Sequence, residues 1–218
     1  MRAPIAAFAA VLVVAGGLPA FAQKAGGNLR VTHRDNPPSA SIHEEATIST
    51  VMPFMSVYNN LVVFDPDSKQ NRPDKIVPDL ATEWAWDKDY TTLTFKLRDG
   101  VKWHDGKPFT SADVKCTWDM LIATDSKLRK NPRKSWWFNL KEVTTNGDQE
   151  VTFHLKRPQP SVLTMLAGAF SPVYPCHADA ARMRTRPIGT GPFKFVELRQ
   201  NESIKLARNP DYWKKSRP

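Results

Sequence analysis

The alternation of apolar and polar residues predicts short strands and helices that follow one another without a fixed order. An apolar period of two residues predicts strands, and a period near 3.6 predicts helices. The predicted strands cover residues 28–33, 62–64, 84–86, 92–97, 138–145, 150–156, 193–198 and 203–208. The predicted helices cover residues 49–61, 111–123, 161–168 and 177–184, and residues 65–78 are predicted to form a loop. We therefore expect a mixed α/β lobe rich in hairpins, without an internal repeat.

The helix expected at residues 111–123 has the clearest local signals. Thr110 precedes it and can cap its amino end with a side-chain hydroxyl. Val114, Trp118 and Leu121 recur at helical spacing and form one apolar stripe. The pattern therefore predicts a capped helix with one buried face.

Tight turns are predicted where Asp or Asn precedes Gly, because these dipeptides tolerate positive φ angles. They occur at residues 99–100, 105–106 and 146–147. The segment Gly189-Thr190-Gly191 differs from a phosphate-binding loop, because Pro192 stands where the Lys of that loop would follow and a strand rather than a helix comes next. We interpret it as a tight crossing where side chains would clash.

Residues 1–22 have the pattern of a secretory signal peptide. A single charge at Arg2 precedes an apolar run, and Ala20-Phe21-Ala22 marks a cleavage site. The run of roughly a dozen residues is shorter than the about 20 that a membrane-spanning helix needs. We expect export with cleavage, which leaves residues 23–218 as the mature chain.

The charge of the chain raises the question of a nucleic-acid partner. The formal net charge is +9 and the sequence contains 7 Trp, a combination that suits a basic groove with stacking side chains. The Lys and Arg residues are nevertheless scattered, and we interpret the densest basic stretch, residues 127–134, as a solvated face. We therefore expect no nucleic-acid binding.

No group of residues has the spacing of a catalytic or metal site. The five His residues are isolated from one another. A zinc site of Cys116, Cys176 and His177 is an alternative, but zinc ligands usually occur in closer local pairs. Asp99 and Asp105 each precede Gly, so turn formation explains them. We expect no enzyme activity, no bound metal and no cofactor.

Cys116 and Cys176 could form a disulfide in an oxidising compartment. Closing a loop of about 60 residues would stabilise the fold by roughly 4 kcal/mol. Two separate buried thiols are the alternative, because the sequence does not fix the distance between the two Cα atoms.

Trp136 and Trp137 are adjacent aromatic residues in an expected loop. Their side chains cannot both point into one core, so we expect one to be buried and the other to be exposed. Plain packing is the commoner role of such residues. The pair is nevertheless the best candidate for a ligand contact that the composition offers.

Four segments, in this order, resemble the extracellular solute-binding protein family 5, which includes the dipeptide-, oligopeptide-, nickel- and haem-binding receptors of ABC importers. The matching segments are residues 76–81 (IVPDLA, with Trp84), 92–114 (TLTFKLRDGVKWHDGKPFTSADV), 187–193 (PIGTGPF) and 209–213 (NPDYW). The resemblance implies the larger, two-lobed type II periplasmic-binding-protein fold, in which a ligand enters a cleft between lobes that close by hinge bending. Members are usually much longer, so we expect this chain to be an incomplete N-terminal lobe without the second lobe and the C-terminal return.

The resemblance also implies a function. It implies a periplasmic receptor, monomeric when complete, that binds peptides or peptide-like solutes and delivers them to an ABC permease in the inner membrane. The ligand-binding positions implied by similarity are Thr32, His33, Ala46, Thr47 and Trp136. The alternative is a truncated single lobe that serves as an interaction or sensory protein without transport.

Overall fold

The computed structural model describes residues 26–124 and 127–214, and the predicted signal peptide lies outside this part of the chain. Residues up to 32 and residues from 33 onward are two separate units. Residues 26–32 have no regular secondary structure, and Leu29 and Val31 are 90% and 76% exposed. The strand predicted at residues 28–33 is therefore wrong. A strand needs a hydrogen-bonded neighbour as well as alternation, and no strand of the described chain pairs with this segment.

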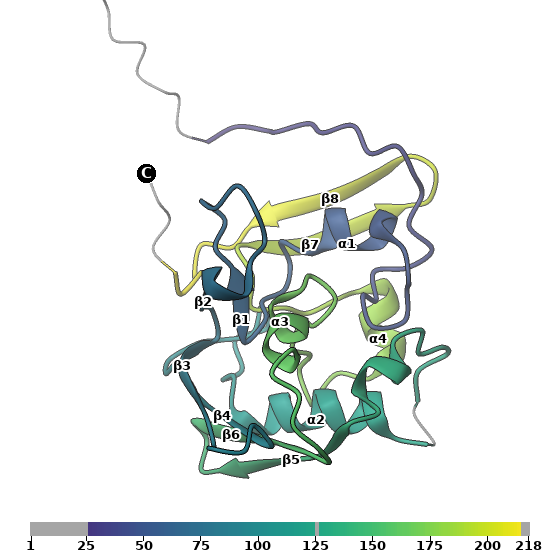
Figure 1. The fold of residues 1–218 in the computed structure, drawn as a ribbon. Coiled ribbons are helices and arrows are strands. Elements are labelled where there is room, and N and C mark those ends of the chain that lie inside the picture. The colour runs from purple at the N-terminus through teal and green to yellow at the C-terminus, as the bar shows by residue number, and fades with distance from the viewer. Residues whose placement is uncertain (1–25, 125–126, 215–218) are drawn as a thin grey trace, which may run out of the picture. The chain divides into compact units, whose positions relative to one another are not determined.

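The second unit contains short helices and three antiparallel sheets (Figure 1). In chain order its elements are α1 (Ile48–Phe54), β1 (Val62–Phe64), the 3₁₀ turn η1 (Pro73–Lys75), β2 (Ile76–Pro78), β3 (Ala81–Trp86), β4 (Thr92–Leu97), α2 (Ser111–Ile122), the 3₁₀ turn η2 (Lys134–Trp137), β5 (Leu140–Asn146), β6 (Glu150–Leu155), α3 (Val162–Ala167), α4 (Ala180–Thr185), β7 (Phe193–Arg199) and β8 (Ser203–Arg208). No helix in the described ranges has both the length and the apolar character that a membrane span requires.

The largest sheet has the strand order β3-β4-β6-β5, with all neighbours antiparallel. Its strands alternate buried and more exposed residues, as the sequence pattern predicts, so one face is apolar. Helix α2 packs on that face, with the Trp118 ring edge-on to Phe153 at a centroid distance of 5.0 Å. The predicted helix at residues 111–123 is confirmed, and its start carries the reciprocal capping pair of Thr110 and Asp113.

Two predicted segments differ from the structure. The helix expected at residues 49–61 ends at Phe54, because the carbonyls of Ser56 and Val57 accept hydrogen bonds from Phe193 and Gly191 instead of continuing the helix. The loop expected at residues 65–78 contains η1 and β2, because residues 76–78 pair with β1. Both differences arise from contacts with distant parts of the chain.

Gly189 and Gly191 lie where two backbone segments cross. A Cβ atom on Gly189 would lie 1.8 Å from the Val57 carbonyl oxygen, and one on Gly191 would lie 2.5 Å from the Ser56 carbonyl oxygen. Neither space can hold a side chain, so the expected tight crossing is confirmed. The amide of Gly191 donates to the Val57 carbonyl at 3.0 Å, which fixes the two segments together.

A buried polar cluster lies next to this crossing and includes Asp79, at 4% exposure. The side-chain amide of Asn59 donates to both carboxylate oxygens of Asp79, at 3.2 and 3.0 Å. The backbone N–H of Asn60 donates to one of these oxygens at 3.2 Å. Asn59 in turn accepts from the Thr190 hydroxyl at 3.0 Å. Burial raises the pKa of Asp79 to about 6, although the hydrogen bond from Asn59 opposes the shift.

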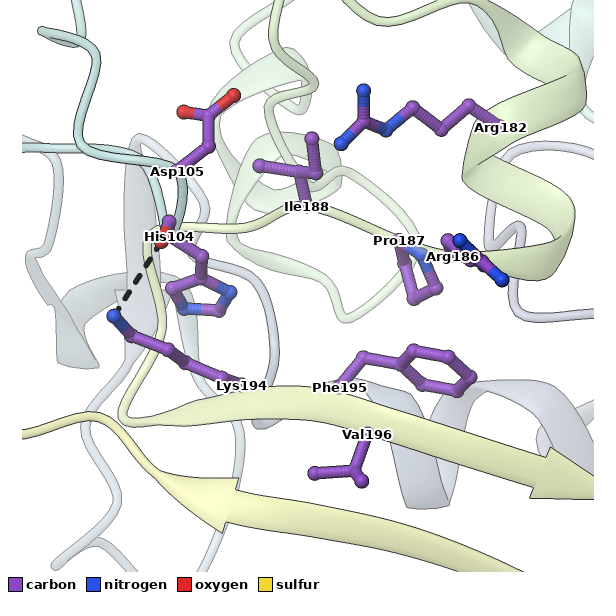
Figure 2. A pocket seen from close by; sticks show the side chains of 9 residues that line it. All are labelled: His104, Asp105, Arg182, Arg186, Pro187, Ile188, Lys194, Phe195 and Val196. Atoms are coloured by element: carbon purple, nitrogen blue, oxygen red, sulfur yellow. Dashed lines mark hydrogen bonds between the residues drawn. The ribbon is translucent and has the colours of Figure 1, made fainter.

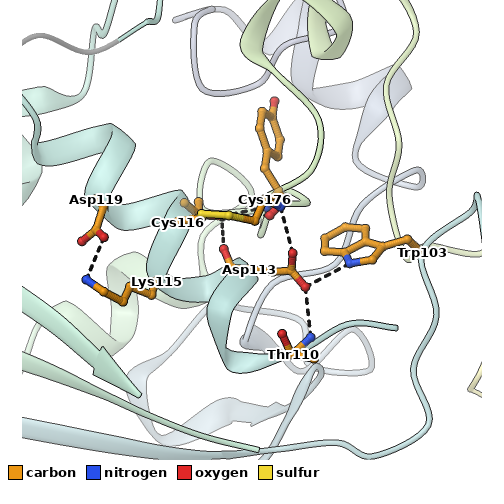
Figure 3. Close-up of a disulfide and its surroundings, with 9 residues drawn as sticks. Trp103, Thr110, Asp113, Lys115, Cys116, Asp119 and Cys176 are labelled. Atoms are coloured by element: carbon orange, nitrogen blue, oxygen red, sulfur yellow. Dashed lines mark hydrogen bonds and ion pairs between the residues drawn. A yellow bond between two sulfur atoms is a disulfide. The ribbon is translucent and has the colours of Figure 1, made fainter. Parts of the chain in front are cut away.

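A second buried carboxylate, Asp113, joins three segments of chain (Figure 3). It accepts hydrogen bonds from the Trp103 indole N–H at 3.1 Å, the Thr110 N–H at 3.0 Å and the Cys176 N–H at 2.8 Å. One turn further along α2, the sulfur of Cys116 is bonded to that of Cys176, and the two Cα atoms are 5.5 Å apart. The loop before α2 and the segment before α4 are thus held to the same end of one helix.

We predict that reducing the Cys116–Cys176 bond lowers the free energy of unfolding by about 4 kcal/mol, because the bond closes a loop of 60 residues. Urea denaturation with and without dithiothreitol measures the difference. The Cys116→Ala/Cys176→Ala double variant is the control, since its stability should not respond to the reductant. Equal stability of the reduced and oxidised wild-type chains would contradict the prediction.

We also predict a pH-dependent contribution from Asp79. Its pKa is about 6 in the fold and about 3.9 in an unfolded chain, so the folded state binds more protons between these values, and stability from this group falls as pH rises. The Asp79→Asn variant has no carboxyl group at this position, so it does not lose this stability as pH rises. Its stability relative to wild type should therefore rise by about 2 kcal/mol from pH 4 to pH 7 in urea denaturation.

The Asp99→Asn variant is the matched control for this measurement, because Asp99 is an exposed turn residue. Its stability relative to wild type should change little over the same pH range. If the difference in unfolding free energy between Asp79→Asn and wild type stays constant from pH 4 to pH 7, the raised pKa of Asp79 is ruled out.

Candidate functional site

Four of the five predicted ligand-binding residues lie in the second unit. His33 and Thr47 meet at Ser49 in the first turn of α1. The His33 Nε2 atom is 2.9 Å from the Ser49 carbonyl oxygen, and the Thr47 hydroxyl accepts the Ser49 N–H at 3.1 Å as the cap of the helix. Ala46 is exposed beside them. Thr32 is exposed and belongs to the first unit.

The two adjacent tryptophans point in different directions, as expected. Trp137 is buried and packs edge-on against Trp118, with ring centroids 5.7 Å apart. Trp136 is 40% exposed and packs edge-on against Phe170 at 6.1 Å. A large ring therefore remains partly open to solvent while its position is fixed from one side.

Arg133 connects Trp136 to the segment that carries Ala46. It is buried, and its guanidinium donates to the carbonyl of Ile42 and, at 2.8 Å, to that of Glu45. The same guanidinium lies 4.4 Å from the centre of the Phe170 ring. One buried cation thus lies against the rings of Trp136 and Phe170 and binds the backbone just before Ala46. We call Ala46, Thr47 and Trp136 the Trp136 surface.

The buried polar side chains behind the Trp136 surface were not predicted. Glu44 and Glu45 are at most 1% exposed. Glu44 accepts from Arg184 at 2.9 Å, and Glu45 pairs with Lys130 at 2.7 Å and Arg129 at 3.4 Å. The interpretation of residues 127–134 as a solvated face is therefore wrong in part. The only sequence signal for these buried ion pairs was the presence of two consecutive acids and a separate basic stretch. This pattern does not say which acid pairs with which base.

His43 is fully buried in the same region and serves a structural role. Its Nε2 atom is 2.7 Å from the Pro172 carbonyl oxygen, which can only accept, so Nε2 carries a hydrogen and donates it there. Burial lowers the pKa of His43 to about 3, and the nearby Arg133 charge acts in the same direction. The ring packs against Tyr174 at 4.5 Å. His43 is therefore neutral at neutral pH, and the fold uses its ring for packing and for the hydrogen bond to Pro172.

The exposed groups of this region suit recognition of a ligand. Among the residues that the structure describes, no three His, Cys, Asp or Glu side chains come together as a metal site. Cys116 and Cys176, which the zinc alternative required, are bonded to each other. An exposed aromatic ring suits contact with the apolar groups of a small molecule.

Comparison with known proteins gives the family. Residues 75–218 match the bacterial extracellular solute-binding proteins, family 5 middle. The putative ABC transporter peptide-binding protein of Brucella ovis is 35% identical over 174 residues, which make up 73% of this chain and 30% of that protein.

Solved structures agree with this match. The dipeptide-binding protein from Pseudoalteromonas sp. SM9913, in complex with Met-Leu, has a TM-score of 0.72 at 25% identity over 83% of this chain and 39% of its own. The oligopeptide-binding protein from Bacillus subtilis, in complex with a nonapeptide, has a TM-score of 0.69 at 28% identity over 81% and 35%.

The chain spans about a third of the length of these relatives. Its described fold is mixed α/β and corresponds to part of the type II periplasmic-binding-protein fold. The match to the family covers more than half of the sequence, and the chain belongs to the bacterial extracellular solute-binding proteins of family 5.

Proposed function

We propose that this protein is a substrate-binding component of an ABC importer that binds a peptide or peptide-like solute. Two relatives that are peptide-binding proteins by name support the solute class. The proposal includes export to the periplasm, a cleft between two lobes in which the solute is held, and delivery to a permease in the inner membrane. It includes no catalytic step.

The observation that carries the proposal is the Trp136 surface. The Trp136 ring is 40% exposed, yet its environment is rigid because Phe170 and Arg133 support it from within. A preformed aromatic contact costs little conformational entropy when a ligand arrives. Ala46 is exposed and directly follows Glu45, whose carbonyl Arg133 also binds, and exposed main chain suits the amide groups of a peptide-like solute.

Buried charges support a binding role over a catalytic one. Glu44, Glu45 and Arg133 are all paired within the fold. Asp113 accepts three hydrogen bonds from the chain, and His43 is neutral and buried. Each of these groups has a structural partner, so the described region offers a binding surface and a firm scaffold.

We predict that Trp136→Ala weakens the binding of the dipeptide Met-Leu by about tenfold, because removing an aromatic anchor from a binding surface typically costs more than 1 kcal/mol. Isothermal titration calorimetry on the exported protein as the cell makes it measures the affinity. The Trp136→Phe variant should recover part of the loss.

Phe138→Ala is the matched control, because Phe138 is 57% exposed and lies just beyond the same 3₁₀ turn. It should leave the affinity unchanged. Trp103→Ala, which removes a buried side chain, should weaken binding less than Trp136→Ala when the two are compared at matched stability. Equal affinities of the Trp136→Ala and wild-type proteins would exclude Trp136 from the binding surface.

A further inference from the structure

A hollow that contains none of the residues of the Trp136 surface lies where the end of α4 meets β7 (Figure 2). It has a volume of about 340 Å³ and is open to solvent on one side. Its walls come from three places in the sequence: the turn at residues 104–105, the segment 182–188 and the first half of β7. A hollow of this size can hold a small organic molecule.

The rim of this hollow carries basic side chains. Arg182 of α4 and Arg186, the residue that follows this helix, both line the hollow. Within the described ranges, neither guanidinium has an ion pair or a hydrogen bond. Figure 2 shows Arg182 extending toward Ile188, with Lys194 across the pocket on β7.

Lys194 is only loosely held. Its ammonium is 3.4 Å from the His104 carbonyl oxygen and 3.7 Å from an Asp211 carboxylate oxygen. Arg184, which lies between the two free arginines in sequence, is in contrast bound to the buried Glu44 at 2.9 Å. A structural role thus accounts for one of the three arginines and leaves the other two facing the hollow.

The remaining polar groups of the hollow are already occupied. Asp105 accepts from His177 at 2.8 Å and from the Lys107 N–H at 3.3 Å. The His104 ring accepts the Gly189 N–H at 3.3 Å through Nδ1 and is 2.9 Å from the Gly191 carbonyl through Nε2. The acid and the imidazole are therefore bound to the protein itself. Three cations outnumber the one carboxylate among the lining residues, so the hollow attracts anions.

The rest of the wall is apolar. Pro187 and Ile188 are buried beneath the arginines, and Phe195 and Val196 of β7 contribute a more exposed apolar surface. A ligand that fits both parts has an anionic head for the guanidinium groups and a short apolar body. An inorganic anion would leave the apolar wall unused.

We propose that this hollow is a binding site for a small organic carboxylate with a short aliphatic chain. The carboxylate meets the guanidinium groups of Arg182 and Arg186, and the aliphatic chain lies against Ile188, Phe195 and Val196. The site is separate from the Trp136 surface, and it stands whether or not the protein binds a peptide there.

Methyl NMR spectra of the chain during titration with hexanoate test this proposal, because Ile188 and Val196 line the hollow and carry methyl groups. We expect saturable shifts of these two residues. Acetate has the charge without the chain and 1-hexanol has the chain without the charge, so each should bind at least about tenfold more weakly. No saturable shift with hexanoate, or shifts spread evenly over the protein, would overturn the site.

Substitutions identify the groups that bind the carboxylate. The Arg182→Gln/Arg186→Gln variant should bind hexanoate at least about tenfold more weakly, and Arg182→Lys/Arg186→Lys should retain part of the affinity. Both side chains are exposed, so the fold is expected to persist, and the dispersion of the methyl spectrum checks it. Arg72→Gln, which removes an exposed arginine elsewhere, and Trp136→Ala should leave hexanoate binding unchanged. Unchanged affinity in the glutamine double variant would overturn the assignment of the arginines.

Discussion

The described fold depends most on a place where two backbones touch with no side chain between them. Gly189 and Gly191 pass so close to Val57 that a single methyl group at either glycine would collide with main-chain atoms. The same short segment binds the ring of His104 and the side chain of Asn209. This crossing therefore fixes three elements to one another: the end of α1, the turn before α2 and the start of β7. The hollow beside β7 takes its shape from this crossing.

The sequence predicted best the elements whose hydrogen bonds and packing are local. The capped helix α2 and the hairpin of β5 and β6 follow from a hydroxyl cap, an Asn-Gly turn and an apolar period. The strand expected at residues 28–33 failed because a strand is defined by its neighbour. The helix expected at residues 49–61 stopped early because a distant segment takes the carbonyls that would have continued it.

The candidate site was predicted in part for a related reason. The opposite orientations of Trp136 and Trp137 follow from their adjacency, since two large rings side by side cannot share one core. The role of Arg133 does not follow, because a basic residue among other basic residues looks solvated until the fold places carbonyls around it. The burial of Glu44 and Glu45 is hidden in the same way. Ion pairs between residues that are far apart in sequence produce no periodic pattern, so they cannot be predicted from periodicity.

The segments that carry the family resemblance are used by the scaffold. Asp79 joins its segment to Asn59, Asp113 binds the turn that precedes its own helix, and Gly191 makes the crossing. The exposed Trp136 lies outside all four segments. A substitution that changes the exposed surface at Trp136 therefore leaves the contacts made by these segments in place.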